Sequence, residues 1–315
     1  MALAGSVLGA CGATRSATPA TPTTAPAASR SPGCGRAPAP GPTGSAEFGD
    51  VTQSIPVDGS VRTYRLAVPA AYRAGRPTPL ILLFHGSGSD AVQQSAYSGL
   101  PTAGAGAGYL VATPDAVGGN WDLAAPGTDT ADQRLVAALE SDLADRYCVD
   151  RTRIYAAGIS LGSEFAAIAA CDPADHIAAV GLVAAEYLLR PCPGPVPVLA
   201  FHGTADPIVP YASGATGRSV PGVPAVGALQ NLEAWARLDR CRPTPGTSAP
   251  APDIVRRQWS GCAAGSSVVL YTVVGGGHTW PGSPVQLSAT AFGPTTASVG
   301  ATRLMLGFFG HHPPR

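Results

Sequence analysis

The sequence of 315 residues contains no lysine, and all 20 of its basic side chains are arginines. The chemistries that need a lysine amine are thereby excluded, namely a phosphate-binding P-loop, a Schiff base and a Ser–Lys dyad. Charged residues are also scarce, at 13% with a formal net charge of zero, whereas about 25% is usual. We therefore expect no nucleic-acid partner. No apolar run is long enough to predict a membrane-spanning helix.

The spacing of cysteine and histidine does not suit a metal site. The seven cysteines form no Cys-x-x-Cys pair and no His-Glu-x-x-His is present, so neither a metal nor a cofactor is expected. Disulfides in an exported protein explain the cysteines better. Setting Cys11 aside leaves an even number, for which several pairings are open. We expect disulfides of Cys148 with Cys171, which bracket one predicted strand and helix, of Cys241 with Cys262, and of Cys34 with Cys192.

The first 46 residues have the composition of a leader followed by a tether. Residues 1–11 are mostly apolar or small and end in Leu8-Gly9-Ala10-Cys11, which resembles a bacterial lipobox whose cysteine is lipidated after signal cleavage. A truncated ordinary secretion signal is the alternative. Residues 12–46 consist mostly of Ala, Thr, Pro, Ser and Gly, so we expect a disordered linker. The protein would then be secreted or held at a membrane by a lipid on Cys11, and residues 47–315 would form one domain.

Strands alternate with helices throughout this domain. Continuous apolar runs, such as residues 80–84, are typical of parallel strands that are covered on both faces. Leu135, Leu139 and Leu143 are spaced four apart, which predicts an amphipathic helix over residues 132–147. The alternation predicts an α/β fold with an open, mostly parallel sheet and helices on both faces. Further strands are expected at residues 109–113, 154–157, 177–184, 196–201 and 268–274, and further helices at 164–171, 229–238 and 298–309.

One stretch carries a recognisable chemical motif. A short predicted strand leads into Gly158-Ile159-Ser160-Leu161-Gly162, and an alanine-rich predicted helix follows. This context is typical of a nucleophile elbow, in which the glycines permit a tight turn that exposes the serine hydroxyl. The N–H groups at the start of the helix then favour developing negative charge. Because the chain has 39 glycines, the motif could arise by chance, and its partners must decide.

Other strands end in residues that could serve as those partners. Active sites of open α/β sheets form at the carboxyl ends of strands, and Asp206 and His278 each follow a predicted strand. The order Ser, Asp, His is the one found in α/β-hydrolases. We predict Ser160 as nucleophile, His278 as general base and Asp206 as the acid that orients the imidazole. Asp253 is the rival acid, but no convincing strand precedes it.

The six histidines are not equivalent. His278 lies in a glycine-rich loop downstream of Asp206, whereas His176 lies in a connection, and His311 and His312 lie in the terminal tail. His85 and His202 each precede a glycine directly after a strand, and we expect them to pack or hydrogen-bond within the turn.

Two further sets of residues are candidates for contacts with a substrate. An oxyanion hole needs two backbone N–H groups, for which we predict Leu161, directly after the nucleophile, and Ser87, in the loop after residues 80–84. Trp121 and Trp280 are predicted to contact the substrate, Trp280 because it lies two residues after the predicted base. For Trp121 the alternative is an aromatic side chain that packs its own loop.

Together these motifs resemble the secreted polyhydroxybutyrate-depolymerase and feruloyl-esterase-type hydrolases. The similarity extends over residues 34–313 and is most specific at Gly275-Gly276-Gly277-His278-Thr279-Trp280-Pro281-Gly282. It includes His85-Gly86-Ser87-Gly88, the serine motif and residues 202–211. Ser163 stands where the family often has another glycine. The resemblance implies an α/β-hydrolase fold with a single catalytic domain that hydrolyses carboxylic esters without a metal or cofactor.

The sequence thus predicts an exported, monomeric serine esterase that forms an acyl-enzyme. Its expected substrates are small-molecule or oligomeric esters, of the short-chain hydroxyalkanoate type or of the feruloyl or acetyl type. A cell-envelope acyltransferase or a peptidase could use the same three residues. A non-catalytic surface binding protein is a further alternative, although binding alone needs no set of Ser160, Asp206 and His278.

Overall fold

The computed structural model describes residues 1–2, 30–36, 49–123, 130–172, 177–189, 192–214 and 226–312. The predicted lipidation site Cys11, the lipobox-like segment from residue 3 onward and His176 therefore lie outside the described residues. So does most of the predicted linker. Within the described ranges, no helix is both long enough and apolar enough to cross a membrane.

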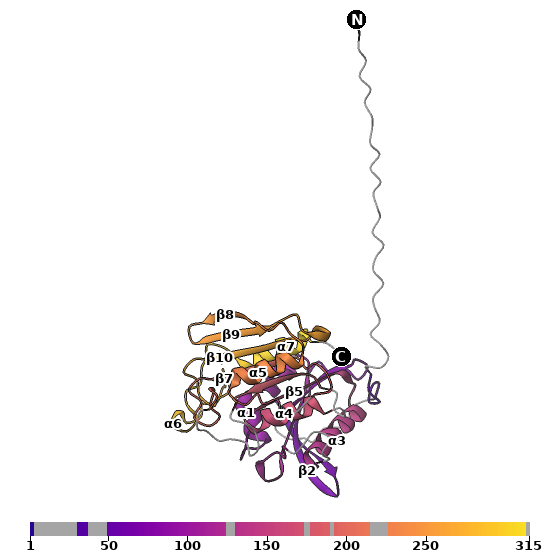
Figure 1. The fold of residues 1–315 in the computed structure, drawn as a ribbon. Helices are drawn as coiled ribbons and strands as arrows, with labels where there is room; N and C mark the ends of the chain where they lie inside the picture. Colours follow the sequence, from indigo (N-terminus) through magenta and orange to yellow (C-terminus); the bar gives the residue numbers. More distant parts are fainter. Residues whose placement is uncertain are drawn as a thin grey trace.

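One sheet runs through the described part of the chain (Figure 1). It has ten strands, in the order β1-β2-β4-β3-β5-β6-β7-β10-β9-β8. The strands from β4 to β10 in this order pair in parallel, and antiparallel strands extend both edges. The strands are β1 (Val51–Val57), β2 (Ser60–Ala67), β3 (Thr78–Phe84), β4 (Leu110–Pro114), β5 (Val149–Ile159), β6 (Ile177–Val183), β7 (Val198–Gly203), β8 (Gly246–Ala251), β9 (Ile254–Trp259) and β10 (Val268–Val273).

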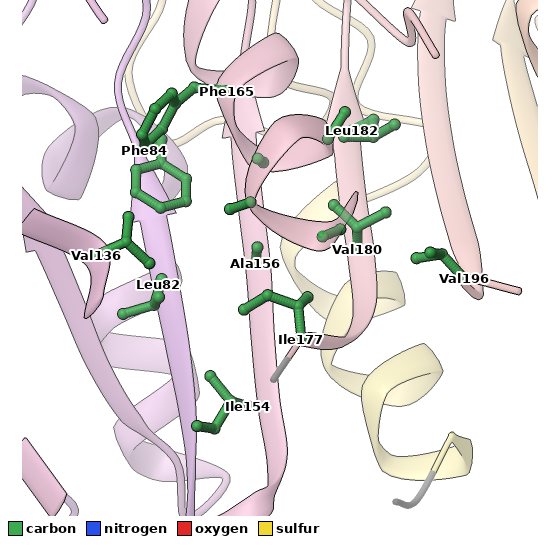
Figure 2. Close-up of a cluster of buried hydrophobic side chains, with 14 of the residues drawn as sticks. Leu82, Phe84, Val136, Ile154, Ala156, Phe165, Ile177, Val180, Leu182 and Val196 are labelled. Carbon is green, nitrogen blue, oxygen red and sulfur yellow. The ribbon is translucent and has the colours of Figure 1, made fainter. Parts of the chain in front are cut away.

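Helices cover both faces of this sheet because its central strands are apolar on both sides. Along β3, Leu82 and Phe84 belong to the core under α3, α4 and α5, whereas Ile81 and Leu83 belong to the core under α1, α2 and α7. Figure 2 shows the first core, where Phe165 of α4 lies beside Phe84. The helices are α1 (Ala91–Ser98), α2 (Leu100–Gly106), α3 (Ala131–Arg146), α4 (Leu161–Cys171), α5 (Ala228–Leu238), α6 (Ala289–Phe292) and α7 (Ala301–His311).

The expected α/β architecture is confirmed, with differences at the short elements. The predicted helix over residues 132–147 corresponds to α3, and the expected central strands fall on β3 to β7 and β10. Helices α1 and α2 were not predicted, because their alanine, glycine and serine residues show no strong apolar periodicity. Strand β8 was missed as well, because its residues are largely exposed at the edge of the sheet and show no apolar alternation.

Residues 30–36 fold onto the domain, which corrects the prediction that they belong to a linker. Arg30 forms a β-bridge with Asp150. The backbone N–H of Gly33 donates to the carbonyl oxygen of Ala144 at 2.8 Å. The hydroxyl of Ser31 donates to the carbonyl oxygen of Tyr147 at 2.7 Å. This short segment therefore lies against the start of β5 and the end of α3.

Three disulfides connect the described residues, and two of the predicted pairings were wrong. The structure joins Cys241 with Cys262 as predicted, but it joins Cys34 with Cys148 and Cys171 with Cys192. The docking of residues 30–36 beside Tyr147 brings Cys34 to Cys148. The end of α4 then meets the segment before β7, which carries Cys192. Three disulfides are typical of an extracellular protein.

Candidate active site

Ser160 occupies a strained turn between β5 and α4. Its backbone has φ 56° and ψ −127°, a conformation that non-glycine residues rarely adopt and that is often found at functional sites. The two flanking glycines make the turn possible. A Cβ atom at Gly158 would lie 2.2 Å from the carbonyl oxygen of Gly162, and one at Gly162 would lie 2.3 Å from that of His85. The motif therefore forms the tight turn between strand and helix that its glycines predict.

Asp206 and His278 meet because their strands are neighbours. Strands β7 and β10 pair in parallel, so the loops that leave their carboxyl ends lie side by side. Oδ2 of Asp206 is 2.7 Å from Nδ1 of His278, and Oδ1 of Asp206 accepts the backbone N–H groups of Ile208 and Val209, each at 2.8 Å. A carboxylate can only accept, so Nδ1 of His278 carries a proton and its Nε2 is free of this contact. Both side chains are buried.

The rival acid Asp253 lies elsewhere. It is in the turn between β8 and β9, and its carboxylate accepts the hydroxyl of Thr296 at 2.5 Å. Side-chain hydrogen bonds from Ser298 and Thr296 lower the pKa of Asp253. No contact of Asp253 with His278 occurs among the described residues, so Asp206 is the acid that the structure pairs with the histidine.

Ser160 and His278 both line one cleft with a volume of about 570 Å³. Its size is typical of a site for a small organic molecule. The wall is largely apolar and comes from α1, from the loop after β7 and from the segment around α6. Sequence patterns did not mark these residues, because they lie in short or irregular elements. The main wall residues besides Ser160 and His278 are Gln94, Tyr97, Ile208, Val285, Leu287 and Phe292.

The two residues predicted for the oxyanion hole flank Ser160. Leu161 is the first residue of α4, so its backbone N–H is among those that have no partner within the helix. Ser87 lines the cleft, and its hydroxyl donates to Oδ1 of Asn120 at 2.6 Å. A Cβ atom at Gly86 would lie 3.5 Å from Cβ of Ser160. The loop after β3 therefore lies directly against the turn that holds Ser160.

The two tryptophans predicted to contact substrate are part of the core. Trp121 is 4% exposed, its indole N–H donates to the carbonyl oxygen of His85 at 2.8 Å, and its ring stacks on Phe165. Trp280 is completely buried, and its indole N–H donates to the hydroxyl of Thr302 at 3.0 Å. Neither is among the residues that line the cleft. The substrate-binding prediction for both tryptophans is corrected accordingly, because their side chains point inward from the loops.

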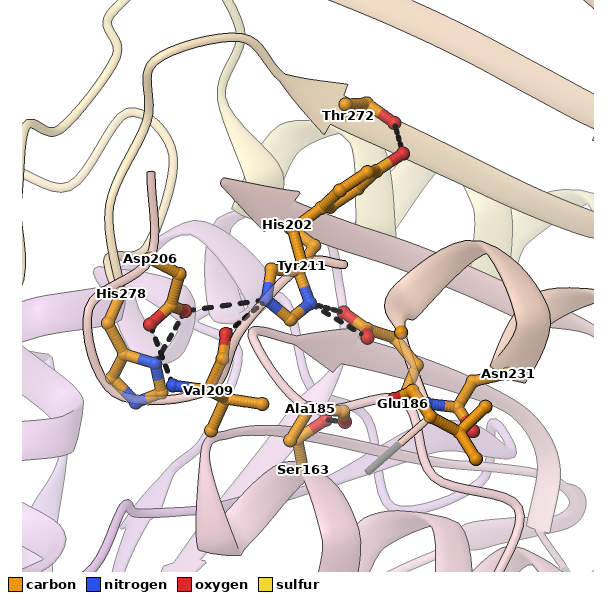
Figure 3. A network of polar contacts seen from close by, with 12 residues as sticks. Ser163, Ala185, Glu186, His202, Asp206, Val209, Tyr211, Asn231, Thr272 and His278 are labelled. Carbon is orange, nitrogen blue, oxygen red and sulfur yellow. Dashed lines mark hydrogen bonds and ion pairs between the residues drawn. The ribbon is translucent and has the colours of Figure 1, made fainter. Parts of the chain in front are cut away.

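A second buried histidine lies behind Asp206, and sequence reasoning missed its partner. Nδ1 of His202 is 2.9 Å from each carboxylate oxygen of Glu186 (Figure 3). Nε2 of His202 is 2.8 Å from the carbonyl oxygen of Val209 and 3.5 Å from Oδ2 of Asp206. Glu186 lies in the irregular segment after β6, where no local pattern distinguishes a buried glutamate from an exposed one. The hydroxyl of Ser163 donates to the carbonyl oxygen of Ala185, which ties that segment to α4.

The described residues include no cluster of three or more His, Cys, Asp or Glu side chains that could hold a metal ion. The site brings together a half-buried serine hydroxyl, an imidazole held by a carboxylate, and backbone N–H groups.

Comparison with solved structures agrees with this fold. The strand order and the elbow define an α/β-hydrolase fold, and the structure of an acetyl xylan esterase from Aspergillus awamori has a TM-score of 0.58 at 15% identity, covering 83% of this chain and 99% of that one. At this identity the likeness shows the fold alone. No family model matches the chain.

Relatives with curated descriptions identify the family. "Putative esterase NocK" of Nocardia uniformis subsp. tsuyamanensis is 31% identical over 273 residues, which is 79% of each chain. Feruloyl esterase B of Piromyces equi is 30% identical over 223 residues, which is 67% of this chain and 41% of that protein. The chain therefore belongs to the same family of carboxylic-ester hydrolases as these esterases.

Proposed function

We propose that the protein is an exported serine esterase in which Ser160, His278 and Asp206 form a catalytic triad. The observation that carries this proposal is the buried contact of 2.7 Å between Oδ2 of Asp206 and Nδ1 of His278. Support also comes from the cleft that His278 shares with the strained Ser160. A surface protein that only binds its ligand would need no such arrangement of hydroxyl, imidazole and carboxylate.

The reaction would proceed through an acyl-enzyme. Oγ of Ser160 attacks the carbonyl carbon of the ester, and Nε2 of His278 takes the hydroxyl proton. The backbone N–H groups of Leu161 and Ser87 stabilise the negative charge that develops on the carbonyl oxygen. The alcohol leaves with the proton that His278 returns. A water molecule then attacks the acyl-enzyme by the same route and releases the acid.

The cleft favours an acyl group larger than acetyl. Its wall contains the rings of Tyr97 and Phe292 and the aliphatic side chains of Val285 and Leu287. Gln94 also lines the cleft although it is only 2% exposed, and its Nε2 has no hydrogen-bond partner among the described residues. A buried donor without a partner is costly unless a ligand accepts from it. We therefore propose an aromatic acyl group with a polar substituent, of the feruloyl type, ahead of a short-chain hydroxyalkanoate or an acetyl group.

The test is labelling with a fluorescent fluorophosphonate, combined with hydrolysis of methyl ferulate and of p-nitrophenyl acetate and butyrate. The wild type should be labelled and should hydrolyse the esters, whereas Ser160→Ala and His278→Ala should do neither. With the same methyl leaving group, kcat/KM for methyl ferulate should exceed that for methyl acetate. A folded wild type that remains unlabelled, or a Ser160→Ala variant with full activity, would contradict the proposed triad.

A cell-envelope acyltransferase or a peptidase would share the triad but differ in product. Product analysis in the presence of a competing acceptor alcohol separates transfer from hydrolysis, and a peptide panel tests for amide cleavage. The wall residues favour hydrolysis of a small ester, because the cleft has the size of a small-molecule site and not of an extended peptide groove.

Export through the N-terminal segment and attachment by a lipid on Cys11 belong to the same proposal. The three disulfides support an oxidising location. The full chain, expressed in a bacterium with a lipoprotein pathway, should separate with the membrane fraction, and Cys11→Ser should release it. If the wild type is recovered only in the medium, the lipid anchor is excluded while export is retained.

A further inference from the structure

A row of ionisable side chains continues from the cleft into the interior. His278 contacts Asp206, Asp206 lies beside His202, and His202 contacts Glu186 (Figure 3). The side chains of His202, Asp206 and Glu186 are almost completely shielded from solvent, with exposures of 1%, 0% and 1%. The mechanism above uses His278 and Asp206 only, so the two inner members have no assigned role.

The contacts of His202 fix its protonation. Nδ1 faces both oxygens of the Glu186 carboxylate, and Nε2 faces the carbonyl oxygen of Val209 and an oxygen of Asp206. All four partners are acceptors. A neutral imidazole would turn the lone pair of one nitrogen toward an acceptor oxygen, so only the doubly protonated ring satisfies both sides. The proton positions follow from these partners.

We infer that His202 is a positioning residue that remains an imidazolium during catalysis and, paired with Glu186, tunes the basicity of His278 through Asp206. A positive charge on the inner side of Asp206 offsets part of the negative charge that the outer side presents to His278. A partly offset carboxylate stabilises the protonated form of His278 less. His278 therefore keeps its base form at a lower pH than it would beside a bare carboxylate. This inference rests on the proposed triad.

The surrounding charges are consistent with this assignment. Burial alone lowers the pKa of His202, but the charge of Glu186, its hydrogen bond and the charge of Asp206 raise that pKa to about 9. Burial together with the negative charge of Glu186 raises the pKa of Glu164, in α4, to about 7. The ring of Tyr211 lies edge-on to the ring of His202, with 5.7 Å between the two ring centroids.

The pair is held by contacts outside the charged groups. The indole N–H of Trp235 donates to the carbonyl oxygen of Glu186 at 2.9 Å, and the hydroxyl of Tyr211 contacts that of Thr272 at 2.9 Å. The bond from His202 to Val209 also braces the turn whose N–H groups hold Asp206. Because both ends of the row are held in place, a change of charge within it should alter the electrostatic potential at His278 without a large movement of the side chains.

The first measurement is ¹⁵N NMR of the histidine rings in the wild-type protein, with His202 assigned by its loss in a variant. Both ring nitrogens of His202 should stay protonated through neutral pH, up to about pH 9. A neutral ring at pH 7 overturns the inference. This readout needs no turnover, so it stands even if the protein hydrolyses no ester and the proposed function fails.

The second measurement is the pH dependence of kcat/KM in the double variant His202→Gln with Glu186→Gln. The double change removes both charges together and leaves no buried unpaired carboxylate. We expect the acidic limb of the profile to move upward by about one pH unit, with a much smaller change on the alkaline plateau. A structural role alone would lower the rate equally at every pH. A doubly protonated His202 combined with an unmoved limb in the variant would overturn the tuning role.

A matched control and a milder variant complete the test. Tyr211→Phe changes the neighbourhood of His202 without changing its charge, so it should leave the acidic limb in place. Should the double variant fail to fold, Glu186→Gln alone removes a negative charge while Val209 and Asp206 still face Nε2 of the protonated His202 ring, so the limb should move in the opposite direction, downward. An upward shift in Tyr211→Phe equal to that of the double variant would contradict the electrostatic explanation.

Discussion

The ends of β3 and β7 look alike in sequence, because each buried strand runs into a histidine and a glycine, but the two histidines differ in charge. Nε2 of His85 accepts the backbone N–H of Ala116 at 3.0 Å, and Nδ1 is 2.8 Å from the carbonyl oxygen of Gly86. One nitrogen therefore accepts and the other donates, as in a neutral ring. His202 faces acceptors on both sides.

Burial affects both rings in the same direction, so burial does not explain the difference. It lowers the pKa of His85, where nearby carboxylates and a backbone contact only partly oppose it. At His202 the adjacent carboxylates of Glu186 and Asp206 outweigh it. The partners that decide the outcome come from other segments of the chain. One strand end thus supports the loop of the proposed oxyanion hole with a neutral ring, and the other supports the proposed catalytic acid with a charged one.

The largest effect that separates the two ends should come from Asp206→Asn. The amide can donate to Nδ1 of His278 and so favour the wrong tautomer, and we expect kcat to fall by about 10⁴. His85→Gln changes no group that reacts and should lower kcat far less. Steady-state kinetics with p-nitrophenyl butyrate at neutral pH measures both. If both variants lose activity to the same extent, the assignment of Asp206 to the catalytic triad is wrong.

The next effect is on stability. His202→Gln leaves the carboxylate of Glu186 buried without its cation, which should lower the free energy of unfolding by roughly 3–5 kcal/mol. His85→Gln leaves at most one buried N–H of Ala116 without an acceptor, so the loss should be about 1–3 kcal/mol. Urea unfolding of the two variants at pH 7, with disulfides intact, gives the comparison. Equal losses would mean that His202 is not charged.

The pH dependence of stability should have opposite signs at the two ends. The folded-state pKa of His202 is raised to about 9, so its contribution, about 3 kcal/mol, is complete below about pH 6.5 and is lost as the pH rises through 9. The folded-state pKa of His85 is lowered, so its contribution is present above about pH 6.5 and is lost on acidification.

Unfolding free energies across this pH range, for the wild type, His85→Gln and the double variant His202→Gln with Glu186→Gln, check both signs. The double variant should flatten the alkaline slope, and His85→Gln should flatten the acidic one. Burial and the charge of Glu186 raise the pKa of Glu164 to about 7. The contribution of Glu164 to the free energy of unfolding is therefore also lost as the pH rises. Adding Glu164→Gln to each protein removes this contribution and leaves the slope that belongs to His202.

The contrast between the ends of β3 and β7 also shows which features the sequence predicts and which it does not. Apolar runs such as residues 80–84 predict central parallel strands, because such strands are covered on both faces. Placing Ser160, Asp206 and His278 at strand ends follows from that, and the structure has them there. Their catalytic roles stay predictions. The charge of His202 could not be read, because Glu186 lies 16 positions away in an irregular segment.

Side-chain direction and long-range docking set the other limits. Trp280 is two positions from His278, but its ring points into the core, and closeness along the chain does not reveal that. The disulfide of Cys34 with Cys148 depends on the docking of residues 30–36, whose composition resembles a linker. Tyr97 and Phe292 reach the cleft from short elements without periodicity. These features arise from packing between distant segments, which local patterns do not contain.

The smallest predicted effect concerns the proposed contact between Gln94 and the acyl group, in which neither His85 nor His202 takes part. Gln94→Met keeps the length of the side chain and removes the buried donor that lacks a partner among the described residues. We expect the preference for methyl ferulate over methyl cinnamate, measured as the ratio of kcat/KM, to fall by about tenfold, because a lost hydrogen bond to the substrate has roughly this effect. Gln93→Met, one position away on the same wall, is the control and should leave the ratio unchanged. An unaltered ratio in Gln94→Met would show that this amide does not read the acyl group, whereas the triad and the charged pair behind it would be unaffected.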